Sequence, residues 1–189
     1  MRFAVGILTF CVASPAAVEH SVLYTIGHGA KNAEELAALL RQHDVALLID
    51  VRRFPGSRRN PDVSKEVMPD WLSAAGIDYR HEPDLGGRRK PPTTPISRDL
   101  WWQNPQFANY AGHTRTPAFA AAFQRLLHDA DTGNVAIMCA EPTWWRCHRR
   151  IIADLATHDG RLVQHIMPNG SLSEHRMSEW LTSEVPGDI

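Results

Sequence analysis

Lysine is scarce in this chain, and so is any excess of charge of one sign. Lys and Arg together number 20, and only Lys31, Lys65 and Lys90 are lysine, so arginine supplies most of the positive charge. The formal net charge of −1 argues against a global basic field that binds nucleic acid non-specifically. Arginine presents a planar fork that suits carboxylate and phosphate groups, although codon bias explains an arginine excess equally well.

Cysteine and long apolar runs are also rare. Three cysteines are too few, and odd in number, for a disulfide scaffold, which fits a reducing compartment. Residues 1–20 are the exception, because an apolar run over 3–13 precedes small residues at 14–17, as in a short secretory signal. They are either a signal peptide of an exported protein or an extension from a start codon assigned too early. We favour the second reading, a cytoplasmic protein, and expect no membrane span elsewhere.

Residues 21–185 predict a single α/β domain, since 189 residues suffice for one core and not two. Helical spacing and capping patterns predict helices that begin near Asn32, Ser64, Thr116, Trp144 and Ser171. Pro69 is expected to kink the second helix, and residues 85–110 to form a long irregular loop. Apolar runs predict five strands, at 21–26, 45–51, 77–81, 135–139 and 162–167. This alternation predicts a three-layer sandwich: a mostly parallel sheet of about five strands with helices on both faces.

Polar residues follow these strands at the end where open parallel sheets bind ligands. Because the carboxyl ends of parallel strands share one edge, we expect these residues to form one site. Its candidate members are Thr25, Gly27, His28, Asp50, Arg52, Ser57, Arg58, Asn60, Gly87, Arg88, Cys139, Glu141, Cys147, His148 and Arg149. Trp101, Trp102 and Tyr110 on the long loop suit base stacking, with anchoring in the core as the alternative.

Cys139 is the candidate nucleophile, since it ends a strand and precedes a helix. The helix dipole and a nearby arginine are expected to lower its pKa and favour the thiolate, with His148 or His28 as acid or base. The alternative is a small buried residue at a strand end. Cys147 falls in phase with Ile151 on the predicted helix, which favours a packing role beside the site.

The segment 52–60 is the clearest anion-binding candidate. Its arginine doublets, with hydroxyl and amide donors at Ser57 and Asn60, suit phosphate. The alternative is a solvated loop with an ion pair to Asp50 or Asp62. The four residues Cys139, Cys147, His148 and His28 are zinc-ligand types, but the cysteines lack the usual close spacing. No metal site is therefore predicted, and the cofactor is left unknown.

Six segments, in this order, resemble the domain-of-unknown-function 488 family over about residues 20 to 170: Tyr24 to His28, Asp50 to Asn60, Leu85 to Arg88, Phe107 to Tyr110, Cys139 to Glu141 and Cys147 to Arg149. The family is uncharacterised, so the resemblance identifies site residues without naming a reaction. The signal-like start and the extra Trp and Pro residues at 90–105 and 142–145 depart from its pattern.

The sequence thus predicts a cysteine-dependent enzyme that acts on an anionic, phosphate-bearing ligand such as a nucleotide or nucleic acid. A nucleotide- or nucleic-acid-binding module without turnover is the alternative, and a Cys/His metal-site protein is the third reading.

Overall fold

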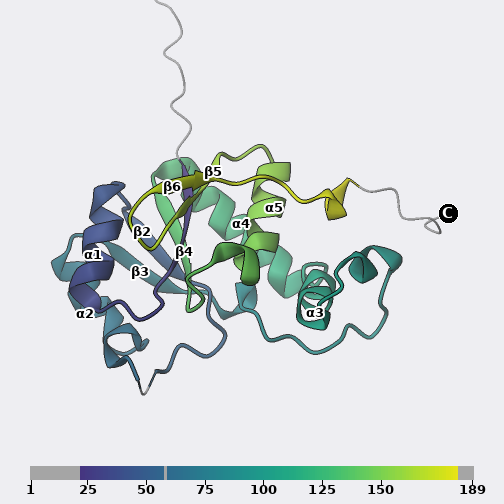
Figure 1. The fold of residues 1–189 in the computed structure, drawn as a ribbon, viewed down its shortest axis with the longest axis horizontal. Coiled ribbons are helices and arrows are strands. Elements are labelled where there is room, and N and C mark those ends of the chain that lie inside the picture. Colours follow the sequence, from purple (N-terminus) through teal and green to yellow (C-terminus); the bar gives the residue numbers. More distant parts are fainter. Residues whose placement is uncertain (1–21, 58, 183–189) are drawn as a thin grey trace, which may run out of the picture.

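The computed structural model describes residues 22–57 and 59–182. Its centre is a six-stranded sheet with the order β3-β2-β4-β1-β5-β6 (Figure 1). The parallel strands are β1 (Leu23–Gly27), β2 (Leu47–Asp50), β3 (Asp78–His81), β4 (Val135–Cys139) and β5 (Val163–Ile166). The predicted α/β architecture with a mostly parallel sheet is therefore confirmed. The predicted extension over residues 1–20 lies outside the described residues.

The sixth strand, β6 (Leu172–Glu174), pairs antiparallel with β5. The prediction of a helix from Ser171 was wrong, although Ser171 and Glu174 have the spacing of a capping box. The Asn169 side chain instead accepts hydrogen bonds from the Ser171 amide and hydroxyl, at 3.1 and 2.8 Å. Gly170 has φ +85°, so a tight turn sends the chain back along β5. Strand pairing prevails over the local capping pattern.

Helices cover both faces of the sheet (Figure 1). The helices α1 (Ala33–Gln42) and α2 (Met68–Ala74) pack on one face, where Leu48 and Met138 point. The helices α4 (Pro117–Thr132) and α5 (Arg149–His158) pack on the other face with α3 (Pro105–His113), and Ile49 and Ile137 point there. Successive strand residues alternate between faces, so Cys139 belongs to the α5 face with Ile137.

The helix boundaries follow local chemistry that the sequence showed only in part. Asn32 caps α1 in a capping box with Glu35, as predicted. The next helix, α2, begins at Met68 and not near Ser64, because Pro69 lies in its first turn, where proline is tolerated, and causes no kink. Within the stretch predicted to be irregular, α3 forms at 105–113, with its N-cap Asn104 side chain accepting from the Gln106 amide.

The helix predicted from Trp144 begins later. A short 3-10 turn covers Trp144–Arg146, and α5 starts only at Arg149. Cys147, between them, has extended backbone angles of φ −123° and ψ 150°, so it lies before the helix and not inside it. Among the helices of residues 22–57 and 59–182, none is both long and apolar enough to cross a membrane.

Candidate functional site

A cavity of about 630 Å³, here called the main cavity, lies at the predicted edge of the sheet. The loops after β2 and β4, the loop after β3 and the start of α3 enclose it. Its walls combine thiols, an imidazole and several guanidinium groups. The lining residues are Gly29, Arg52, Arg53, Phe54, Gly87, Arg88, Asn104, Gln106, Phe107, Tyr110, Cys139, Ala140, Glu141, Pro142, Arg146, Cys147 and His148.

Glycines let these loops approach one another. A Cβ on Gly87 would lie 2.8 Å from the Nδ1 atom of His148, and one on Gly27 would lie 2.0 Å from the Glu141 carbonyl oxygen. No other residue fits those two positions without moving its neighbour. Arg88, directly after Gly87, has φ +56°, a conformation that costs energy for a side-chain-bearing residue. Such strain is tolerated where the surrounding fold imposes it, here at the rim of the cavity.

Two thiols and an imidazole meet at one wall of the cavity. The Sγ atom of Cys147 lies 3.6 Å from the Nδ1 atom of His148, and the Sγ atom of Cys139 lies 3.9 Å from the same nitrogen. The His148 ring packs against Tyr110, with centroids 5.0 Å apart. The fold therefore brings together the three side chains Cys139, Cys147 and His148, of which the sequence assigned one cysteine to packing.

The two thiols have opposite acidities. A hydrogen bond to Cys147, together with burial, raises the pKa of Cys139 well above its usual value. Burial also raises the pKa of Cys147, but the hydrogen bond from Cys139 and the charges of His148 and Arg149 outweigh it and hold that pKa well below its usual value. The expectation that Cys139 carries the lowered pKa was wrong. The lowered pKa falls on Cys147, which lies at the N-terminus of α5 and beside Arg149.

Arg149 acts from beneath the cavity. It is 1% exposed, its Nε donates to the Sγ atom of Cys147 at 3.4 Å, and its NH2 donates to the Glu141 carbonyl. In the part of the chain that the structure describes, no carboxylate lies within ion-pair distance of this guanidinium. A buried guanidinium needs acceptors nearby, and the Cys147 sulfur and the Glu141 carbonyl accept its hydrogen bonds. The guanidinium predicted to hold a ligand is thus directed at a cysteine.

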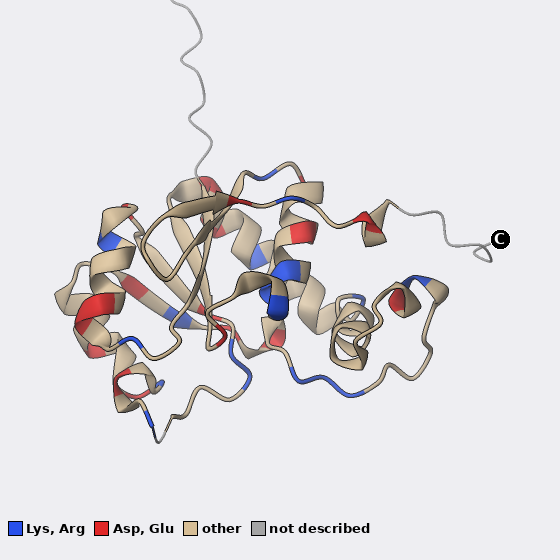
Figure 2. Ribbon diagram, viewed as in Figure 1, with Lys and Arg blue, Asp and Glu red and all other residues tan. Residues whose placement is uncertain are grey.

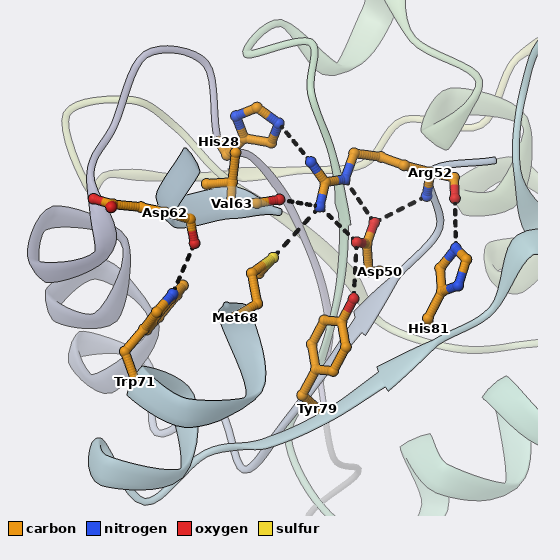
Figure 3. Close-up of polar contacts among 9 residues, drawn as sticks. All are labelled: His28, Asp50, Arg52, Asp62, Val63, Met68, Trp71, Tyr79 and His81. Carbon is orange, nitrogen blue, oxygen red and sulfur yellow. Dashed lines mark hydrogen bonds and ion pairs between the residues drawn. The ribbon is translucent and has the colours of Figure 1, made fainter. Parts of the chain in front are cut away.

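Arg52 is held in a second buried network, on the α2 side (Figure 3). Its guanidinium pairs with Asp50 at 2.6 Å, donates to the Val63 carbonyl and lies 3.2 Å from the Nε2 atom of His28. The Tyr79 hydroxyl completes the network by donating to Asp50 at 3.1 Å. Burial and the charge of Arg52 lower the pKa of His28, so this imidazole is neutral at pH 7. These groups fix the loop after β2 and leave the guanidinium of Arg52 little capacity for a ligand.

Several other predicted site residues do not line the main cavity. Thr25 donates into the sheet-side network described below, and Gly27 packs against the Glu141 backbone. The Ser57 hydroxyl accepts from the Asn60 amide, and the Asn60 side chain donates to the Lys31 carbonyl. Tyr110 does line the cavity, but its hydroxyl donates to the Leu85 carbonyl at 2.6 Å. Arg58 lies outside the described residues.

The segment 52–60, predicted to bind an anion, contributes Arg52, Arg53 and Phe54 to the lining of the main cavity. Arg52 is 6% exposed and its guanidinium pairs with Asp50, whereas Arg53 is only half-buried. Phe54 and Arg146 line the cavity and are exposed. Trp102, proposed for stacking, is buried in the core against Phe107. Figure 2 shows Lys and Arg on the loops that follow β2 and β3 and at the start of α5.

Behind the cysteines lies a buried hydrogen-bonded chain that the sequence did not reveal. Asp154 accepts from His175 at 2.8 Å, the His175 and His165 rings meet at 3.0 Å, and His165 contacts the Thr25 hydroxyl at 2.7 Å. Because the carboxylate accepts, His175 donates through Nε2, so His165 donates to His175 and accepts from Thr25. Trp144, three residues before Cys147, stacks on His165 at 4.0 Å. These hydrogen-bonded side chains, here called the Asp154 network, therefore support the loop that carries the thiols.

Because of the Asp154 network, we expect the protein to lose stability in acid. Burial, and then the charges of His175 and Arg149, lower the pKa of His165 from 6.5 to about 3. The unfolded chain therefore takes up this proton first, and stability present above pH 6.5 falls as the pH drops towards 3. We expect a loss of about 2 kcal/mol in unfolding free energy between about pH 7 and 5. Urea titrations at both pH values measure it, and His165→Asn should reduce the loss; an unchanged loss in that variant would contradict the assignment.

The cysteines and His148 also have the geometry of a soft-metal site. The Sγ atoms of Cys139 and Cys147 and a ring nitrogen of His148 all lie within 4.8 Å of one another. Ligand atoms bound tetrahedrally to zinc have similar separations. His28 is not part of this group, so the four-residue set weighed from the sequence does not form. The fold thus supplies the closeness that the sequence spacing lacked.

Comparison with known proteins gives one match. Searches of curated proteins and of solved structures return none. A family model described as "Domain of unknown function DUF488" matches residues 32–156, which contain the lining residues from Arg52 onward and both cysteines of the site. The chain belongs to the DUF488 family.

Proposed function

We propose that this protein is a cysteine-dependent enzyme acting on an anionic, phosphate-bearing ligand in the main cavity. One observation carries the proposal. The Sγ atom of Cys147 accepts a hydrogen bond from the Nε of buried Arg149 at 3.4 Å and lies 3.6 Å from the Nδ1 atom of His148. A thiolate held by a guanidinium at a helix N-terminus is the activated form of a cysteine nucleophile. Its position in the wall of a cavity gives a ligand access to it.

The remaining groups fit defined roles. Cys139, more exposed than Cys147, keeps its proton and donates a hydrogen bond to the thiolate, which holds the thiolate in place. His148 is the acid or base, since its Nδ1 faces both thiols and its buried Nε2 has no hydrogen-bond partner in residues 22–57 and 59–182. Arg53, Arg88 and Arg146 line the cavity and bind the anion by charge-assisted hydrogen bonds. The nucleophile is thus moved from Cys139 to Cys147.

Alkylation tests the thiolate. At about pH 6, where ordinary thiols are protonated, iodoacetamide should label Cys147 and leave Cys139 unlabelled, as mapped by mass spectrometry of peptides. Inorganic phosphate should slow the labelling, because the bound anion covers the thiolate. Cys139→Ser should retain reactivity at Cys147, since it replaces one hydrogen-bond donor by another. Labelling of Cys147 only above about pH 8 would sink the proposal.

Two alternatives predict different results. If the protein is a binding module without turnover, its affinity for phosphate should be the same whether Cys147 is free or alkylated. In that case Cys147 should also not be a thiolate below about pH 7. A metal site is favoured by the closeness of the three ligand atoms, which belong to residues that line the main cavity. Metal analysis of the purified protein, with and without the Cys139→Ser substitution, distinguishes that reading from a free thiolate.

A further inference from the structure

A second, smaller cavity adjoins the main cavity. It measures about 320 Å³ and shares Arg53 with the main cavity. Its other lining residues include Arg89, Lys90, His113 and Thr116, and none of the described residues that line it is acidic. In the main cavity, Glu141 is the acidic lining residue, and its carboxylate accepts from the amide and hydroxyl of Thr143. The two cavities therefore lie on either side of Arg53, and their basic lining residues together are here called the basic tract.

The cations of this tract lack ion-pair partners among the described residues. Arg89 donates to the Gly86 and Pro83 carbonyls and Arg53 to the Arg88 carbonyl, and the charge of Asp84 acts on Arg89 without a direct contact. In the described ranges 22–57 and 59–182, no ion pair joins a carboxylate to Arg53, Arg88, Arg89, Lys90 or Arg146. Elsewhere on the described surface, Arg80, Arg115, Arg125 and Arg161 form ion pairs, whereas the exposed Arg41, Arg59 and Arg176 form none within the described residues, so the cluster and not the missing ion pair distinguishes this tract. Burial and the nearby charge of Arg53 lower the pKa of Arg89, as expected when cations are held together. An anionic ligand would relieve this repulsion.

Helix N-termini add to the positive potential in both cavities. The main cavity is lined by Asn104 and Gln106 at the start of α3, and the second cavity by Thr116, the N-cap of α4. The dipole of a helix favours phosphate groups at its N-terminus, although here the Gln106 and Phe119 amides already donate to the capping side chains of Asn104 and Thr116. Each cavity thus combines arginine or lysine with a helix start, and Arg53 connects the two. This arrangement suits a ligand with successive phosphates better than a single free anion.

An exposed aromatic ring completes the tract. Phe54 lines the main cavity and is 64% exposed, an unusual state for phenylalanine, and the Arg53 guanidinium lies 5.3 Å from its ring centroid. Aromatic rings beside a basic groove stack bases in proteins that bind single strands. We propose that the two cavities bind single-stranded nucleic acid: one nucleotide occupies the main cavity, the adjoining phosphates occupy the second, and Phe54 stacks a base. This inference rests on the proposed function in one respect only: the proposed function decides which nucleotide of the strand faces Cys147.

Binding of labelled oligonucleotides to the wild-type protein, followed by fluorescence anisotropy, tests the proposal. Oligothymidylate and oligouridylate of about ten nucleotides should bind more tightly than thymidine monophosphate, with log Kd changing by about 0.7 per unit of log salt for each phosphate neutralised. Either sugar form supports the inference, and their ratio identifies DNA or RNA as the source. Phe54→Ala should weaken binding about ten-fold.

A matched pair of variants locates the second cavity. Lys90→Gln should weaken oligonucleotide binding and reduce the salt slope by about 0.7, while leaving thymidine monophosphate binding unchanged. Lys65→Gln removes the same charge from an exposed site outside both cavities and should change neither. Equal effects of the two substitutions, or equally strong competition by an oligoglutamate peptide, would overturn the proposal. If the protein binds the oligonucleotides but Cys147 is not alkylated at about pH 6, the proposed function is wrong and this inference still holds.

Discussion

Asp154→Ala is expected to lower the unfolding free energy by about 3 kcal/mol or more. The Asp154 carboxylate is 0% exposed and accepts from three groups of the C-terminal segment. These are the His175 ring at 2.8 Å, the Ser178 amide at 2.7 Å and the Trp180 indole at 2.8 Å. Alanine leaves all three donors buried without an acceptor, and each such group costs about 1–3 kcal/mol.

Urea denaturation followed by circular dichroism measures this loss. Asp154→Asn keeps the shape and one acceptor oxygen, so it should be intermediate. Asp131→Ala, which removes an exposed carboxylate paired with Arg161, is the control and should leave the midpoint unchanged. The same experiment reports on the site, because Trp144 stacks on His165 and the loop to Cys147 depends on that packing. An Asp154→Ala midpoint equal to that of the control would show that the network contributes no stability.

The sequence predicted the sheet well because its strands carry unambiguous local signals. The strand β4 is a continuous apolar run, and α1 begins with a full capping box, so neither depends on distant residues. The last predicted helix failed because the capping-box pattern at Ser171 is also compatible with a turn, and pairing with β5 decided between them. Likewise, α3 was missed because its proline lies at the first helical position, where proline signals a helix start as readily as a loop.

The site was predictable in its location and less so in its chemistry. Parallel strands bring their carboxyl ends to one edge, so Cys139 and the loop after β2 could be placed near each other from the sequence. Which arginine of a doublet faces inward depends on backbone direction, which residue types do not encode. Arg52 turned to Asp50 and Arg149 turned to Cys147, leaving Arg53 and Arg146 to the cavity.

The acidity of the cysteines likewise depends on where α5 begins. A start at Trp144 would place Cys147 inside the helix, whereas the observed start at Arg149 places it at the positive end of the helix dipole. Sequence patterns alone do not predict the first residue of a helix to within a few positions. With the observed start, the lowered pKa falls on Cys147 at the helix start and not on Cys139 at the strand end.

Replacing Cys147 by alanine is expected to destabilise the protein by about 3–5 kcal/mol, because it leaves the buried Arg149 guanidinium without its anion. Arg149→Met alone should also destabilise, and it should slow alkylation of Cys147 at about pH 6 at least ten-fold by raising the thiol pKa. The double variant removes both charges, so its loss should be smaller than the sum of the single losses. The expected coupling energy is about 2–3 kcal/mol.

A double-mutant cycle of urea denaturation at about pH 7 measures this coupling. The exposed pair of Arg161 and Asp131 is the control, since solvent screens it and no coupling should be resolved there. Additive losses for Cys147 and Arg149 would mean that Cys147 is a neutral thiol. Strong coupling together with slowed alkylation would mean that a single buried ion pair contributes both to stability and to the reactivity of the site, because removing Arg149 would then reduce the two together.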